Sequence, residues 1–148
     1  MCNYCGCRSF PAIARLTEEH EGITEAAGRL RAAISTGHGD PVELAEALDA
    51  LDALLELLAP HTVTEESGLF AELRAEGGFA EELDKLRAEH EDIHQALVRV
   101  DRAAPEWAPV LTALDRLRRH IDAEQYGLFP AAAIALPMPA WERLTPAE

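Results

Sequence analysis

The residues of this chain best suited to chemistry are histidines and glutamates that lie on or beside apolar helical stripes. The chain has six histidines, and five of them occupy such positions. Two glutamates follow a histidine by four residues, which places both side chains on one helix face, one turn apart. Neutral imidazole and carboxylate are both good metal ligands, so the set predicts a metal centre. Its members are His20, His61, Glu65, His90, His94, His120 and Glu124.

The size of this set predicts two metal ions rather than one. An unpaired buried polar group costs roughly 1–3 kcal/mol and an isolated buried charge far more, so these inward side chains require cations between them. Seven protein ligands are too many for one ion. Two octahedral ions bridged by both glutamates and by an oxo or hydroxo group would keep one open coordination position, as reactive centres do. Nitrogen and oxygen donors without thiolate favour iron, with manganese and zinc as less favoured alternatives.

Four segments with helical periodicity must position these residues. Ala and Leu dominate the apolar residues and aromatic residues make up only 5% of the chain, a composition that favours helix over strand. The breaks between segments are short, so neighbouring helices should run antiparallel. The sequence therefore predicts an all-α, up-down-up-down four-helix bundle. Apolar residues recur every three or four positions over 13–34, 48–69, 83–100 and 110–128.

Three regions follow from this pattern. A segment at 1–9 contains all three cysteines, the bundle is expected over 10–132, and a tail occupies 133–148. Within the tail, a short helix is expected around Trp141. Gly77-Gly78 should end the second helical segment, while Asp40 and Pro41 should begin it.

The chain also contains an internal repeat. EEHEGI at 18–23 is similar to AEHEDI at 88–93, and HTVTEESGLF at 61–70 is similar to HIDAEQYGLF at 120–129. The first and third helical segments therefore match each other, as do the second and fourth. The bundle is expected to consist of two copies of one helical hairpin facing each other.

Taken in order, these motifs resemble the hemerythrin family in its bacterial, hemerythrin-like (HHE) branch. The resemblance rests on the lone His20, then HxxxE at His61 and Glu65, then HxxxH at His90 and His94, and a final pair at His120 and Glu124. It implies that His90, His94 and His120 hold one iron and that His20 and His61 hold the other. It further implies that Glu65 and Glu124 bridge the ions and that the open position lies on the two-histidine iron.

One departure from the oxygen-carrying hemerythrins concerns the last pair. Those proteins place an Asp five residues after the final histidine, whereas Glu124 follows His120 by four. Four-residue spacing occurs in the HHE branch, whose members are not uniformly oxygen carriers. The resemblance therefore implies a di-iron centre more firmly than it implies reversible oxygen carriage.

Three functions are compatible with these residues. The first is binding of O2, or of peroxide or nitric oxide, at an open iron position for sensing, buffering or oxidative-stress defence. The second is catalase- or peroxidase-like turnover of hydrogen peroxide. The third is handling of iron or repair of iron centres, in which Cys2, Cys5 and Cys7 would act as redox groups or accessory metal ligands. An inert zinc-binding bundle is a fourth, weaker alternative.

Charge and hydropathy argue against other classes of partner. The net charge is −14 with no run of basic residues, which disfavours nucleic acid and anionic membranes. No apolar stretch of roughly 18 residues is present. The first residues lack the layout of a secretory signal, so a cytoplasmic protein is expected. We expect a monomer or weak dimer, and His38, between two glycines, is expected to be solvated.

Overall fold

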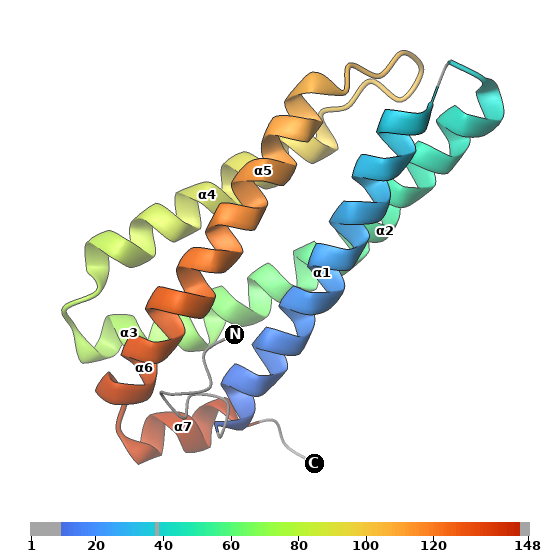
Figure 1. Ribbon diagram of the computed structural model, residues 1–148. Coiled ribbons are helices and arrows are strands. Elements are labelled where there is room, and N and C mark those ends of the chain that lie inside the picture. The colour runs from blue at the N-terminus through green and yellow to red at the C-terminus, as the bar shows by residue number, and fades with distance from the viewer. Residues whose placement is uncertain (1–9, 38, 146–148) are drawn as a thin grey trace.

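The computed structural model describes residues 10–37 and 39–145. No strand occurs among these residues, and the predicted all-α fold is confirmed. Figure 1 shows the helices in chain order. They are α1 (Pro11–Thr36), α2 (Pro41–Ser67), α3 (Leu69–Glu76), α4 (Ala80–Val98), α5 (Ala108–Ala123), the π-helical η2 (Glu124–Leu128), α6 (Phe129–Ala135) and α7 (Met138–Leu144).

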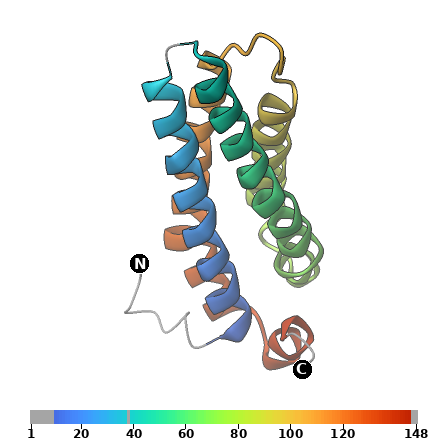
Figure 2. The same ribbon diagram turned by 90° about the vertical axis from the view of Figure 1, so that its right-hand side faces the viewer.

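The four long helices α1, α2, α4 and α5 form the bundle. α1 packs along α2, and α4 packs along α5; α2 also contacts α4, and α1 contacts α5, which closes the ring. The α1–α2 and α4–α5 connections lie at one end, whereas α3, α6 and α7 gather at the other (Figures 1 and 2). This is the predicted up-down-up-down arrangement. None of the helices among the described residues has the length and apolarity needed to cross a membrane.

The ends of α2 and α3 follow the expected local signals. Asp40 caps α2 by accepting a hydrogen bond from the Val42 backbone N–H at 2.8 Å, and Pro41 occupies the first turn. Gly77 and Gly78 both have a φ near 90°, a conformation that glycine adopts without strain, and they separate α3 from α4.

The second helical segment is interrupted where the sequence predicts continuity. α2 ends at Ser67, and α3 begins at Leu69 after Gly68. A Cβ at Gly68 would lie 2.8 Å from the Thr64 carbonyl oxygen and 3.3 Å from Leu144 Cδ2, so this close approach requires glycine. Apolar periodicity continues across the break and therefore does not reveal it.

The fourth segment is distorted at the corresponding place. α5 passes into the π-helical turn η2, which begins at Glu124 and includes Gly127, the repeat counterpart of Gly68. π-Turns inserted in α-helices are frequent at functional sites. Both copies of the repeat thus depart from regular α-helix within three residues of a candidate glutamate ligand.

The hydrophobic core consists of two clusters on either side of a polar layer. One cluster, at the end that holds α3, α6 and α7, includes Leu16, Leu86 and Leu128. The other includes Ile23 and Ile93. The candidate ligands lie between these levels along each helix, so apolar side chains cover the polar layer from both ends.

The C-terminal helix α7 closes one end of the bundle. It contains Trp141, as the sequence predicts, and this side chain is buried. The Trp141 ring stacks on Phe10 with 4.2 Å between centroids, and its indole N–H donates to the Leu136 carbonyl at 3.2 Å. α7 therefore attaches the tail to the start of α1.

Candidate metal centre

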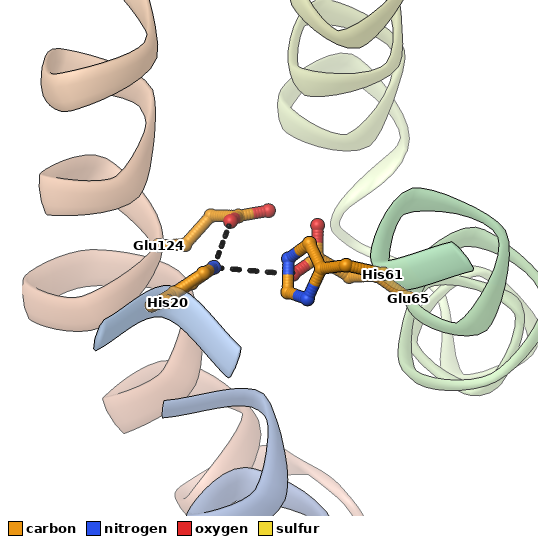
Figure 3. Close-up of side chains that lie close together, drawn as sticks. All are labelled: His20, His61, Glu65 and Glu124. Atoms are coloured by element: carbon orange, nitrogen blue, oxygen red, sulfur yellow. Dashed lines mark ion pairs between the residues drawn. The ribbon is translucent and has the colours of Figure 1, made fainter. Parts of the chain in front are cut away.

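Six of the seven predicted ligands converge inside the bundle. Each helix of the bundle contributes at least one of them, and none is more than 7% exposed. Figure 3 shows four of these side chains pointing toward one another from α1, α2 and η2. The converging residues are His20, His61, Glu65, His90, His120 and Glu124.

These six residues form two groups that share both glutamates. The first group adds His20 and His61 to the glutamates, and the second adds His90 and His120. Within each group, one ligand atom from every residue lies within 4.8 Å of all the others. The arrangement thus offers two adjacent cation positions, each with two imidazoles and two carboxylate oxygens.

Glu65 divides its two oxygens between the positions. Its Oε2 lies 3.3 Å from His61 Nε2 and 3.7 Å from His20 Nε2, while its Oε1 lies 3.1 Å from His90 Nε2. One oxygen therefore faces each histidine pair. This is the disposition required of a carboxylate that bridges two ions.

Glu124 repeats the arrangement from the opposite side. Its Oε1 lies 3.0 Å from His20 Nε2, and its Oε2 lies 3.3 Å from His120 Nε2. His90 Nε2 and His120 Nε2 are 2.8 Å apart. The internal repeat seen in the sequence thus becomes an approximate two-fold symmetry of the site.

The donor atoms fit metal ions because their polar groups are otherwise unsatisfied. Although imidazole nitrogens lie close to them, neither the oxygens of Glu65 and Glu124 nor His20 Nε2 form a hydrogen bond of acceptable geometry, and both carboxylates are fully buried. Buried polar groups in native proteins are nearly always satisfied, and a buried charge left unpaired is costly. Two cations at the shared positions would satisfy all of them.

In the absence of cations, protons take over the same electrostatic role. Burial acts to lower the pKa of His20, but the neighbouring Glu124 and Glu65 carboxylates raise it to about 10. Burial opposes protonation of the other three histidines as well, yet Glu65 raises the pKa of His61 and His90, and Glu124 raises that of His120. The two carboxylates therefore favour positive charge at the site, either as protons on the histidines or as bound cations.

The two glutamates respond differently to their shared burial. Burial alone raises the pKa of Glu65, but interactions with Glu124 and the histidines lower it well below its ordinary value. The pKa of Glu124 is raised, because this carboxyl is buried next to the Glu65 charge. Without a cation, the two carboxylates cannot both be ionised at low cost.

Side chains outside the candidate ligands contact the four histidines and orient their rings. Each histidine uses Nε2 to face the centre and Nδ1 to contact an outer oxygen acceptor. The Nδ1 atoms lie 2.8 Å from Gln125 for His20, 2.8 Å from Glu19 for His61, 2.9 Å from Glu66 for His90 and 3.1 Å from Glu89 for His120. Carboxylate oxygens only accept, so the Nδ1 atoms of His61, His90 and His120 donate, and their Nε2 lone pairs remain available to a metal.

The sequence marks these four outer partners of the histidines only weakly. Glu19, Glu66 and Glu89 are adjacent in sequence to predicted ligands, but this position does not distinguish a histidine partner from a glutamate on a solvated face. The same holds for Gln125, which follows Glu124. The internal repeat carries the relevant signal, because Gln125 follows Glu124 as Glu66 follows Glu65.

Two phenylalanines cover the histidines on the side that faces α3, α6 and α7. Phe129 stacks on His20 with ring centroids 5.5 Å apart and an interplanar angle of 4°. Phe70 stacks on His90 at 5.8 Å and 9°. Both phenylalanines are about 2% exposed or less and occupy equivalent repeat positions. They fix the ring planes and exclude water from that side.

Comparison with known proteins agrees with this geometry. The family model described as the hemerythrin HHE cation-binding domain matches residues 12–132, which is most of the chain and includes all six converging residues. The chain belongs to the hemerythrin HHE cation-binding family. No curated protein and no solved structure matches it. Cation binding is thus the property shared by the family match and by the two buried groups of this HHE domain.

His94 does not join either cation position of the HHE domain. It is half-buried and lines an open hollow between α2 and α4, beside Thr62 and Arg87. On α4, Ile93 and Leu97 occupy the inward positions, and His94 lies at the edge of their stripe. The geometry therefore provides four histidines rather than five, and His94 as a ligand stays a prediction.

The remaining predicted groups cannot be placed. Cys2, Cys5 and Cys7 lie outside the described residues, as do His38 and the segment 1–9 as a whole. Their proposed roles as redox groups or accessory metal ligands stay predictions from the sequence.

Proposed function

We propose that this protein is a non-haem di-iron protein that binds O2, or a related small ligand such as peroxide or nitric oxide, at open iron positions. The observation that carries the proposal is the sharing of Glu65 and Glu124 between two histidine pairs. Two ions held by these shared carboxylates would be able to act together on one small molecule. The proposed roles are sensing, buffering or oxidative-stress defence.

The donor set supports iron over the alternatives. His20 and His61 would hold one ion, His90 and His120 the other, and both glutamates would bridge. Imidazole and carboxylate donors without thiolate suit iron or manganese, whereas structural zinc sites are commonly closed by cysteine. Bound iron would supply a redox-active pair able to exchange electrons with a small ligand.

The number of protein donors supports ligand binding. Each ion would receive two imidazole nitrogens and two carboxylate oxygens, which is fewer than the six ligands of an octahedral ion, even after an oxo or hydroxo bridge is added. An open position would then exist on each ion. The sequence interpretation with His94 as a ligand would close one of these two positions.

The surroundings of the site support a small and uncharged or weakly charged ligand. Phe70 and Phe129 stack on His90 and His20, and the apolar clusters cover both ends of the polar layer. These side chains keep bulk water away from both ends of the polar layer, while the open hollow between α2 and α4 that reaches His90 gives a small ligand a route to the site. Their role is to protect the centre from solvent.

Peroxide turnover is the second candidate function, favoured by the similarity of the two cation positions. Because both positions have the same donor types, a ligand with two oxygens would find an open position on each ion. Oxygen evolution after peroxide addition to the di-iron protein measures this activity. A rate no greater than that of free iron would exclude it.

The test of the first candidate is a spectrum. The protein is loaded with two Fe(II) ions without air, and near-ultraviolet and visible absorption is followed after addition of O2 or of nitric oxide. New bands in the iron form and none in a zinc-loaded form are expected, because zinc has no redox chemistry. An iron-loaded spectrum that neither gas alters would contradict the proposal.

Other expectations from the sequence stay predictions. They comprise a cytoplasmic location, a monomeric or weakly dimeric state, the absence of nucleic-acid and membrane partners, and iron handling through the cysteines. The last is tested by replacing Cys2, Cys5 and Cys7 with Ser and measuring iron transfer to an apo acceptor, which should be unchanged if they have no role.

A further inference from the structure

The outer partners of the four histidines are not all of one kind. Three of them are carboxylates, on Glu19, Glu66 and Glu89, whereas His20 contacts the carboxamide oxygen of Gln125 at 2.8 Å. This is a difference in charge at an otherwise symmetric site. The His90–His120 pair has two carboxylate partners, whereas the His20–His61 pair has only one.

The internal repeat shows that this difference involves two linked positions. Gln125 stands where the other half has Glu66, and Thr17 stands where the other half has Arg87. Arg87 Nε lies 3.2 Å from Glu66 Oε1 and so supports the carboxylate that contacts His90. Thr17 is buried, and its Oγ1 has no hydrogen-bond partner. One half therefore carries a charged pair where the other half carries two neutral side chains.

The charge of an outer partner changes the strength of the imidazole as a ligand. When Nε2 binds a cation, positive charge builds up on the ring and at the Nδ1 hydrogen. A carboxylate at Nδ1 stabilises that charge through a charge-assisted hydrogen bond, whereas a carboxamide does so less strongly. Substitution of a side chain that hydrogen-bonds to a metal-binding histidine commonly changes metal affinity by about 10–100-fold.

We propose that Gln125 makes the two cation positions unequal, so that the His90–His120 position fills first and the His20–His61 position fills second and empties first. This inference rests on the proposed pair of ions. Gln125 acts through His20 and is a positioning residue. The half-loaded protein would then be a defined species with its ion between α4 and α5.

The test is a titration of metal-free protein with Zn²⁺ alone, which avoids redox reactions. Calorimetry measures the two binding steps, and nitrogen NMR of labelled histidines identifies which rings change at one equivalent. In the unsubstituted protein, His90 and His120 should respond first. Their response should be nearly complete before His20 and His61 respond.

Two reciprocal substitutions measure the effect of the outer partner. Gln125→Glu should strengthen the second step by about 10-fold or more, so that the two steps approach each other. Glu66→Gln should weaken the first step by about 10–100-fold. The variant that combines Gln125→Glu with Glu66→Gln keeps the net charge of the protein. It should reverse the order in which the two positions fill, so that His20 and His61 respond first.

A matched control separates this local effect from added charge. Gln95→Glu makes the same chemical change on α4, at a side chain that contacts Glu91 rather than a histidine of the site. It should leave the ratio of the two affinities unchanged. If Gln125→Glu does not fold, the reciprocal Glu66→Gln carries the test alone.

Two results would overturn the inference. One is an equal response of all four rings at one equivalent in the unsubstituted protein. The other is a ratio of affinities that Gln125→Glu or Glu66→Gln alters no more than Gln95→Glu does. Either result leaves two bound ions and therefore the proposed function intact, whereas failure to bind any Zn²⁺ or iron would overturn both.

Discussion

Glu19 on α1 accepts a hydrogen bond from His61 on α2, with 2.8 Å between Oε1 and Nδ1. The contact joins neighbouring helices at the level of the site and turns the other ring nitrogen of His61 toward the centre. Its repeat counterpart joins Glu89 on α4 to His120 on α5 at 3.1 Å. The same residues thus connect the helices of each hairpin and orient the ligands, so that the fold and the site are specified together.

Replacement of His94 tests how many histidines bind metal. His94→Ala should leave the metal content per chain unchanged, because this half-buried side chain lies outside both groups of converging ligands. His90→Ala, one turn away on the same helix, is the matched control and should lower the metal content. Elemental analysis of the purified variants measures both. Loss of an ion from His94→Ala would restore the five-histidine interpretation.

Metal removal should lower the thermal stability of the protein. Cations that bind the folded chain and not the unfolded chain stabilise the folded state, by about 2.7 kcal/mol per ion at a free concentration of about 100 times Kd. For a chain of this size, that corresponds to a Tm shift of roughly 5–11 °C per ion. Calorimetric scans before and after treatment with a chelator provide the measurement. Identical scans would show that the buried carboxylates do not depend on cations.

The metal-free protein should lose stability as the pH rises from about 6.5 to about 10. The pKa of His20 is raised from 6.5 to about 10 in the folded state. The proton on His20 therefore stabilises the folded state fully below pH 6.5, and this contribution is lost as the pH rises to about 10. His61, His90 and His120 are shifted in the same direction. Denaturant unfolding at several pH values measures the trend.

The metal-loaded protein is the control for this pH dependence. Titratable groups outside the site are the same in both forms. At the site, the histidines bind cations instead of protons. The stability of the metal-loaded protein should therefore decline less over the same interval. Equal slopes in the two forms would contradict the assignment of the protons to the site.

The two repeat-related glycines should respond oppositely to substitution. Gly68→Ala should destabilise the protein by about 1–3 kcal/mol, because its Cβ would lie 2.8 Å from the Thr64 carbonyl oxygen. Gly127→Ala should be neutral or stabilising by up to about 1 kcal/mol, since nothing lies within 4 Å of its Cβ position. Denaturant midpoints measure the difference. Equal effects would show that the break at Gly68 is not sterically required.

The helices and most of the site were predictable because both follow from local spacing. Apolar residues at every third or fourth position identified the four bundle helices, and the same spacing placed His61 with Glu65 and His120 with Glu124 on inward faces. The internal repeat then predicted that the two halves face each other. Inward polar groups in this number left metal as the only partner able to satisfy them.

The features that the sequence did not predict depend on how the helices meet. His94 shares the HxxxH spacing with His90 but lies at the edge of the stripe on α4 and outside both groups of converging residues, so its role as a ligand stays a prediction. At Gly68, a close approach to the nearby Thr64 carbonyl combines with packing against Leu144 of α7, which is distant in sequence. The partnership of Gln125 with His20 spans 105 residues and depends on the relative register of α1 and η2.

The most direct test of the account is the number of iron ions per folded chain before and after Glu65→Ala. Glu65 gives one oxygen to each cation position, so the unsubstituted protein should hold two iron ions, and the variant should lose both together. Glu56→Ala, on an exposed face of the same helix, is the control and should keep both ions. A Glu65→Ala variant that keeps its full pair, or a well-folded unsubstituted protein that binds no iron, would contradict the shared-carboxylate centre.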